Sequence, residues 1–199
     1  MVEKRQGMLL MLVGPSGVGK GTMAARLLEK YPEFGFSVSA TTRAPRVGEE
    51  NGVHYFFMTD EAYDQLLAED AFLEHAAVHG NRYGTLRREV DSRLDAGRSV
   101  LLDIDHQGAE QVLASGVECV SVFILPPSMA ALEQRLRGRG TETEEAIQRR
   151  LHNARGEIAV MHRFRYILIN DDMDRCFEKL CMIVEAEKQR TVRYFPEID

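Results

Sequence analysis

The chain has 199 residues, 44% of them hydrophobic and 28% charged, and a formal net charge of −6. This is the composition of an ordinary globular protein, and it excludes a disordered chain, a collagen-like fibre and a coiled-coil rod. No apolar run approaches the roughly 20 residues of a membrane span, and the run of residues 8–13 is too short for a signal peptide, so we expect a cytoplasmic protein. The negative charge gives no argument for nucleic-acid binding.

Short apolar runs alternate with helical patterns along the chain. Strands are predicted, in chain order, at residues 8–13, 34–39, 53–58, 72–78, 99–104, 117–125 and 166–169. Helices are predicted at residues 20–30, 60–69, 85–96, 107–114, 128–137, 142–160 and 174–190. Four of the strand runs are almost continuously apolar, which is typical of parallel strands covered on both faces. The alternation indicates right-handed βαβ units and an α/β fold with a parallel sheet flanked by helices.

Two segments depart from this alternation. Residues 34–84 hold strands with little helix between them, and they predict a smaller, mostly antiparallel insert. Around residues 135–143, Gly138 and Gly140 separate two helices. Thr141, with Glu144 three residues later, has the pattern that caps the start of the second helix.

A glycine-rich motif, Gly14-Pro15-Ser16-Gly17-Val18-Gly19-Lys20, follows the first predicted strand and opens the first predicted helix. It fits the G-x-x-x-x-G-K pattern of a phosphate-binding loop, in the context which that pattern requires. The glycines let backbone amides point inward, the helix N-terminus completes an anion cradle, and Lys20 reaches the β- and γ-phosphates. A glycine-rich turn with a surface lysine is the alternative that this context disfavours.

The next position departs from the motif, because Gly21 stands where a serine or threonine would bind Mg²⁺, and Thr22 follows it. We therefore expect no direct protein ligand for the metal, which nucleotide oxygens and water would hold near Thr22 and Asp103. Asp103 ends a buried strand, where side chains of an α/β sheet face the ligand crevice. Capping of the following helix is the alternative role for Asp103, and Asp105 would project to the same side.

Arginine dominates the basic residues, since only five of the 25 are lysine, and eight arginines lie between Arg135 and Arg165. Arginine grips phosphate in a bidentate manner, so this cluster favours an anionic ligand. Part of the cluster is expected to be a solvated helix face, namely Arg137, Arg149, Arg155, Arg163 and Arg165. The cysteines and histidines follow no metal-ligand spacing, and we expect buried reduced thiols at Cys119, Cys176 and Cys181.

Seven short motifs follow the loop in order. They are residues 39–46 (SATTRAPR), 50–55 (ENGVHY), 72–76 (FLEHA), 81–85 (NRYGT), 102–108 (LDIDHQG), 135–144 (RLRGRGTETE) and 170–172 (NDD). Together they resemble guanylate kinase over almost the whole chain. One stretch departs from the resemblance, because residues 163–166 (RFRY) are more basic than the acidic-aromatic stretch expected there.

The resemblance implies a P-loop kinase that transfers the γ-phosphoryl group of ATP to GMP, with Mg²⁺ accompanying ATP and with neither nucleic acid nor membrane as partner. It implies a core of residues 1–33, 85–134 and 160–199, a GMP-binding insert of residues 34–84, and a lid of residues 135–159. The oligomeric state stays open.

The resemblance also implies roles for single residues. The catalytic set would be Lys20, Arg43, Arg135, Arg139 and Arg150. ATP would be bound by Gly14, Pro15, Ser16, Gly17, Val18, Gly19, Lys20, Gly21 and Thr22, with Asn170 near the adenine. The GMP phosphate would be held by Arg43, Arg46, Tyr55 and Tyr83. The guanine site would comprise Ser39, Glu74, Thr85 and Asp105, with Asp103 nearby.

These residue types suit the chemistry. Two anionic nucleotides repel each other, and phosphoryl transfer asks the protein mainly for positioning and charge stabilisation, which arginines supply. Guanine presents N1–H and N2–H₂ as adjacent donors that a carboxylate such as Glu74 accepts, whereas adenine presents an acceptor at N1. A site built on such hydrogen bonds rejects a ligand that cannot make them.

Two other functions stay open at this point. A non-catalytic scaffolding module of the same fold should have lost the loop lysine or the lid arginines. A kinase for another phosphorylated acceptor, such as a sugar phosphate, should lack the base-reading residues Ser39, Glu74 and Asp105. All of these residues are present in the chain.

Overall fold

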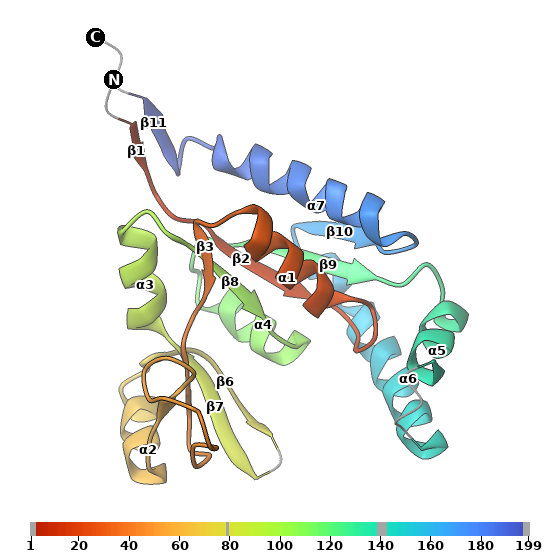
Figure 1. Ribbon diagram of the computed structural model, residues 1–199, viewed down its shortest axis with the longest axis horizontal. Coiled ribbons are helices and arrows are strands. Elements are labelled where there is room, and N and C mark those ends of the chain that lie inside the picture. The colour runs from red at the N-terminus through yellow and green to blue at the C-terminus, as the bar shows by residue number, and fades with distance from the viewer. Residues whose placement is uncertain (1–2, 79, 139–142, 197–199) are drawn as a thin grey trace.

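A five-stranded parallel sheet forms the centre of the computed structural model, which describes residues 3–78, 80–138 and 143–196 (Figure 1). Its strand order is β10-β9-β2-β8-β3, and every neighbouring pair is parallel. The strands are β2 (Leu9–Val13), β3 (Phe34–Phe36), β8 (Ser99–Asp103), β9 (Val120–Leu125) and β10 (Tyr166–Ile169). The predicted parallel sheet is confirmed.

Helices cover both faces of this sheet. Alternate residues of β2 explain why, since Leu10 and Leu12 belong to one apolar cluster and Leu9 and Met11 to another. The first cluster includes side chains of α1 (Lys20–Lys30) and α7 (Met173–Lys188), and the second includes those of α3 (Arg87–Asp95) and α4 (His106–Ala114). A strand whose two faces are both covered must be apolar at every position.

The insert forms a separate four-stranded sheet in the order β5-β4-β7-β6 (Figure 1). Its elements are β4 (Ser39–Thr41), β5 (Phe56–Phe57), α2 (Asp60–Ala68), β6 (Phe72–Val78) and β7 (Asn81–Leu86). The pairs β4–β7 and β6–β7 are antiparallel, and only β4–β5 is parallel. The mostly antiparallel character of the predicted insert is thus confirmed, although residues 34–36 of the expected range form β3 of the core sheet. Ala40, Tyr63, Phe72 and Leu86 form a small core for the insert.

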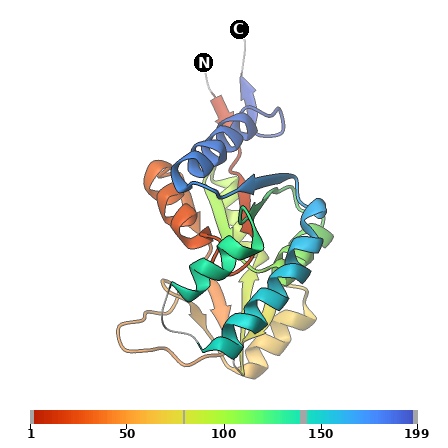
Figure 2. The same cartoon turned by 90° about the vertical axis from the view of Figure 1, so that its right-hand side faces the viewer.

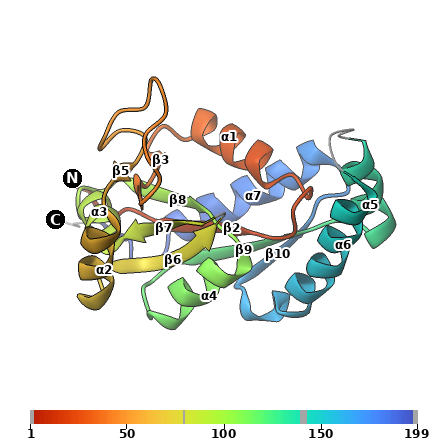
Figure 3. The same ribbon diagram turned by 90° about the horizontal axis from the view of Figure 1, so that it is seen from below.

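Helix α4 lies against β6 and joins the insert to the core (Figure 3). The side chain of Gln111 makes two hydrogen bonds, both of 2.9 Å, with the backbone N–H and carbonyl of His75. Backbone groups of the edge strand β6 are thereby paired with a side chain from a core helix, which links the insert to α4 in this structure.

Helices α5 (Met129–Arg137) and α6 (Glu144–Ala159) form a pair near the carboxyl ends of the parallel strands (Figure 2). They share an apolar cluster that includes Leu136 and Leu151. The predicted start of α6 is corrected: the helix begins at Glu144, and Thr143 caps it by accepting a hydrogen bond from the N–H of Ala146. Thr141 lies outside the described residues.

Several predicted boundaries change because backbone pairing overrides local pattern. The expected strand at residues 34–39 is divided between β3 and β4, which belong to different sheets, and the expected strand at 53–58 is reduced to β5. Residues 85–86 extend β7 rather than opening a helix. The sequence analysis missed three further features: strand β7, the antiparallel pair β1 (Glu3–Arg5) and β11 (Tyr194–Pro196), and the short 3₁₀ helix η1 (Met161–Arg163).

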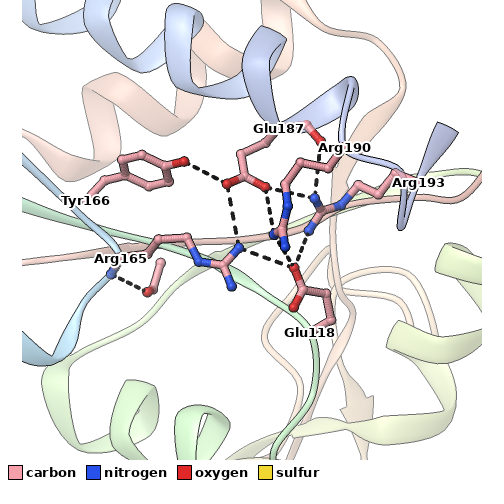
Figure 4. A network of polar contacts seen from close by, with 7 residues as sticks. Glu118, Arg165, Tyr166, Glu187, Arg190 and Arg193 are labelled. Carbon is pink, nitrogen blue, oxygen red and sulfur yellow. Dashed lines mark hydrogen bonds and ion pairs between the residues drawn. The ribbon is translucent and has the colours of Figure 1, made fainter.

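The basic stretch at residues 163–166 has a structural explanation (Figure 4). Glu187 is 3% exposed and accepts hydrogen bonds from Tyr166 (2.7 Å) and Arg193 (2.8 Å), with Arg165 at 3.5 Å. Arg165 and Arg193 also meet Glu118. Burial by itself would raise the pKa of Glu187, but the hydrogen bond from Tyr166 and the surrounding arginines lower it. This network ties the end of α7 to the starts of β9 and β10.

Three further observations concern the cysteines, clusters of metal-ligating side chains and membrane-spanning helices. The three cysteines are free and buried, as predicted. Over the ranges described above, no group of three or more His, Cys, Asp and Glu residues is arranged to hold a metal ion. Within the same ranges, none of the helices combines the length and the apolar character that crossing a bilayer requires.

Candidate active site

The phosphate loop joins β2 to α1 at the carboxyl edge of the parallel sheet. Its three glycines have positive φ angles, 143° at Gly14, 90° at Gly17 and 104° at Gly19. A Cβ at Gly14 would lie 2.2 Å from the carbonyl oxygen of Ile124. Only glycine fits this combination of left-handed backbone and close approach, so the loop is shaped by β9 beneath it.

Lys20 folds back over the loop, and its Nζ donates a hydrogen bond to the carbonyl oxygen of Gly14 and lies 3.4 Å from that of Pro15. Burial lowers the pKa of Lys20, and the negative charge of Asp103 opposes that shift. Burial likewise raises the pKa of Asp103, opposed by the charge of Lys20. The amine therefore lies at the loop, where the negative charges of Asp103, Glu157 and Asp105 together oppose the effect of burial.

Asp103 lies where the sequence analysis expected it, at the end of β8. It lines a hollow of about 450 Å³ together with residues of the loop and the start of α1. Thr22 lines the same hollow, and a Cβ added to Gly21 would meet nothing within 4 Å. The alternative role for Asp103 is not observed, because Asp105 caps α4 through a 2.9 Å hydrogen bond from Gly108 N–H.

Two of the three expected lid arginines lie close to the loop. Arg150 of α6 donates a 2.5 Å hydrogen bond to Oγ of Ser16, and Arg135 of α5 donates one of 2.8 Å to the backbone carbonyl of Asn170. Arg139 lies outside the described residues. Arg137 pairs with Glu133 and Glu144 on the surface, which agrees with its prediction as a solvated residue.

The expected base-reading residues of the insert form a row across three neighbouring strands. Thr85 of β7 is the register partner of both Ser39 of β4 and Glu74 of β6. Residues paired in register point to the same face of a sheet, so these three side chains share one face. Asp105, the N-cap residue of α4, lies close enough for its charge to act on the Glu74 carboxylate.

Glu74 is 9% exposed, and its Oε1 accepts a 2.6 Å hydrogen bond from the hydroxyl of Thr85. Burial raises the pKa of Glu74; the Thr85 hydrogen bond opposes the shift, and the charge of Asp105 adds to it. A Cβ at Gly108 would come within 2.9 Å of Oε2. A buried carboxylate held this way retains acceptor capacity on both oxygens for a planar pair of donors.

The expected phosphate-binding residues gather beside this row. The guanidinium of Arg43 lies 5.4 Å from the ring centre of Tyr55, whose ring is 6.1 Å from that of Tyr83. Arg43 also forms a 2.8 Å ion pair with Glu49. Arg46 is exposed, and its backbone N–H donates a 2.7 Å hydrogen bond to the other oxygen of Glu49.

The sequence analysis missed two acidic residues here. The hydrogen bond from Arg43 lowers the pKa of Glu49, which orders the arginine and its loop. Glu157 of α6 is close enough to Lys20 and His106 for their charges to act on it, while burial raises its pKa. The signal for Glu49 was its place three residues after Arg46 in a turn. Glu157 has a spacing of two helical turns from Arg150, which puts both on one face of α6.

Asn170 lies beneath the phosphate loop and is 1% exposed. Its side-chain amide donates a 2.7 Å hydrogen bond to the carbonyl oxygen of Val18. The expected contact with adenine stays a prediction.

Comparisons with known proteins agree with this geometry. The family model described as guanylate kinase matches residues 6–187. A guanylate kinase of Synechococcus sp. (strain CC9902) is 52% identical over 174 residues, covering 87% of this chain and 93% of the relative. One of Clostridium perfringens (strain SM101 / Type A) is 47% identical over 191 residues, covering 96% and 88%. The chain belongs to the guanylate kinase family.

Solved structures extend the comparison. The crystal structure of guanylate kinase from Anaplasma phagocytophilum has a TM-score of 0.70 and 34% identity, and it covers 97% of this chain and 92% of that one. The SH3-kinase fragment of tight junction protein 3, with a TM-score of 0.52 and 13% identity, shares the fold alone. Family membership confirms the predicted P-loop kinase fold and the predicted enzyme class, an ATP:GMP phosphotransferase.

Proposed function

We propose that this guanylate kinase binds GMP on its insert and ATP on its phosphate loop, and transfers the γ-phosphoryl group between them to give ADP and GDP. The observation that carries the assignment of the acceptor is the row of Ser39, Thr85 and Glu74 across three strands. Glu74 takes the N1–H and N2–H₂ donors of guanine on its two oxygens. Adenine places an acceptor where the first of those donors would be, so the site discriminates against AMP.

The GMP phosphate binds beside the guanine site. Arg43 lies among Tyr55, Tyr83 and Glu49, and its guanidinium is held in a fixed orientation by the 2.8 Å ion pair with Glu49. Arg46 is exposed on the same loop and completes the phosphate grip. An arginine that is already ordered loses less conformational entropy when it binds a phosphate than a freely moving one.

In the transfer step, an oxygen of the GMP phosphate attacks the γ-phosphorus of ATP, and the bond from that phosphorus to the bridging oxygen breaks. The acceptor is already an ionised oxygen, so the protein need not remove a proton. Lys20 and the lid arginines Arg135, Arg139 and Arg150 balance the negative charge on the transferring group. Arginines in this role contribute roughly 10³- to 10⁵-fold in related phosphoryl transfers.

Magnesium would bind together with ATP. Gly21 offers no ligand, but the Thr22 hydroxyl and the Asp103 carboxylate line one hollow with the loop, a donor set that suits a hydrated Mg²⁺. The ion supplies neutralisation of phosphate charge. If Thr22 and Asp103 hold its water shell, Thr22→Val should raise the Mg²⁺ concentration for half-maximal rate several-fold, whereas an unchanged requirement would remove Thr22 from this role.

The lid and the insert should close on the core when both nucleotides bind, because closure excludes water that would otherwise hydrolyse ATP. In the described residues, α5 and α6 pack on each other through their own cluster, as the insert does, which suits two parts that move as units. Small-angle scattering with and without a bisubstrate analogue tests closure. Identical radii of gyration would contradict it.

Location in the cytoplasm stays a prediction.

A coupled ADP-release assay with Mg-ATP and GMP, dGMP, AMP, UMP or no acceptor tests the function. Turnover with GMP and little with AMP is expected. A folded protein that binds GMP but turns over no acceptor would contradict the proposal and favour a scaffolding module. Equal turnover of AMP or a sugar phosphate would show that the base-reading row does not select the substrate.

A further inference from the structure

Asn170 sits at a junction of three elements. It follows β10, so it lies at the same carboxyl edge of the sheet as the phosphate loop that follows β2. Its backbone N–H donates a 2.8 Å hydrogen bond to the carbonyl oxygen of Leu125, at the end of β9. The backbone of Asn170 is therefore fixed relative to the sheet.

The side chain of Asn170 supports the loop from below. Its Nδ2 donates to the carbonyl oxygen of Val18, and a Cβ added to Gly19 would come within 2.7 Å of that same nitrogen. Gly19 precedes α1 at its N-cap position, where no side chain accepts a hydrogen bond from the helix. The asparagine amide thus holds the turn from which α1 starts and from which Lys20 projects.

The other side of the junction leads to the lid. The backbone carbonyl of Asn170 accepts the 2.8 Å hydrogen bond from Arg135, in the last turn of α5. Leu136, the next residue of the same helix, packs against the loop itself, since a Cβ added to Gly17 would lie 2.8 Å from the Leu136 side chain. Helix α5 is thus placed beside the loop by two contacts. One is the apolar contact of Leu136 with the loop at Gly17, and the other is the hydrogen bond from Arg135 to Asn170.

Resting on the proposed function, we propose that Asn170 is a positioning residue that couples the conformation of the phosphate loop to the placement of Arg135. Its side chain holds the carbonyl of Val18 in the loop, and its backbone carbonyl holds Arg135. A shift of the loop therefore moves Arg135, and a shift of Arg135 moves the loop. This role is exerted from inside the protein, at 1% exposure, and needs no contact with the adenine base. The role concerns the transferring phosphoryl group, which the proposed function assigns to Lys20 and Arg135, rather than the GMP site.

The test is Asn170→Ala, with Gln189→Ala as a surface amide control outside the site. We expect kcat to fall roughly 10- to 100-fold, the loss expected from misplacing catalytic groups by about 1 Å. KM for GMP should stay within about twofold, since the insert is untouched. A loss confined to KM for ATP with kcat unchanged would indicate an adenine contact instead and overturn the proposal, as would an unchanged kcat.

A double-mutant cycle tests the coupling itself. If Asn170 acts through Arg135, adding Asn170→Ala to Arg135→Ala should reduce kcat by clearly less than it does in the wild type. Losses that multiply would overturn the coupling. Asn170→Ser, which leaves a smaller polar group, serves as the second variant should the alanine variant fold poorly.

A readout without turnover separates this proposal from the proposed function. In the nucleotide-free protein, amide hydrogen exchange at residues 18–20 should quicken in Asn170→Ala and not in Gln189→Ala. Unchanged exchange would overturn the loop-supporting role whatever the substrate proves to be. A wild type with no GMP turnover would instead refute the proposed function, leaving the exchange result to stand by itself.

Discussion

Replacing Glu74 by glutamine tests the guanine site with little change in shape. The carboxylate is buried, accepts the Thr85 hydroxyl at 2.6 Å, and has no cation bonded to it among the described contacts. In the variant, the amide oxygen still faces one guanine donor, while the amide NH₂ can donate to the Thr85 oxygen after the hydroxyl rotates. One charge-assisted hydrogen bond to guanine is therefore lost.

Hydrogen bonds to charged groups contribute about 1.5–3 kcal/mol. Since 1.4 kcal/mol corresponds to a tenfold change, kcat/KM for GMP should fall roughly 10- to 150-fold in Glu74→Gln. The amide can pair with the donor and acceptor of adenine, so activity with AMP should rise relative to GMP. The coupled ADP-release assay with both acceptors measures this ratio.

Glu61→Gln is the matched control, because it makes the same chemical change at an exposed position on α2 of the same insert. It should leave both acceptors unaffected. If Glu74→Gln retained wild-type kcat/KM for GMP, guanine could not be read by this carboxylate, and the argument from the strand register would fail.

Three further outcomes are expected. Because burial raises the pKa of Glu74, it takes up a proton at a higher pH than an exposed glutamate; KM for GMP should rise as pH falls through that pKa, and a pH profile of Glu74→Gln should lack this limb. Arg150→Ala removes the contact with Ser16, and it should lower kcat far more than it lowers the affinity for GMP measured by calorimetry. A loss of GMP affinity with kcat unchanged would contradict the assignment of Arg150 to the transferring phosphoryl group. Glu187→Ala leaves the 5%-exposed Arg193 side chain without its buried partner, so it should destabilise the fold by about 3–5 kcal/mol and lower Tm by roughly 6–20 °C in a calorimetric scan; an unchanged Tm would show that Glu118 alone satisfies the arginine.

Local patterns predicted the parts of this protein whose structure depends on neighbours in the chain. The continuous apolar runs of β2 and β8 reflect burial on both faces, and the glycine spacing of the phosphate loop reflects backbone angles that only glycine adopts readily. Helix α1 begins and ends where its pattern indicated. The ordered series of motifs also indicated the family, because each motif is a short segment with a characteristic sequence.

Contacts between residues that are distant in the chain could not be predicted from local patterns. Glu49 was missed because its place in the turn indicates a local contact with Arg46 but not the ion pair with Arg43. The basic stretch around Arg165 was unexplained because Glu118 and Glu187, which lie beside it, are far away in the chain. Strand β7 was missed because its apolar and polar residues alternate weakly, and pairing with β4 and β6 on its two sides is what makes it a strand.

The sequence by itself thus determined the phosphate loop, the parallel core and the candidate residues for both nucleotides. Only the tertiary structure decided that Ser39, Thr85 and Glu74 form one row, since strand register brings together residues up to 46 positions apart. It also decided that Asn170 supports the loop, a contact between residues 152 positions apart. Such contacts depend on how strands and helices pack, and packing is a property of the whole fold that no local spacing encodes.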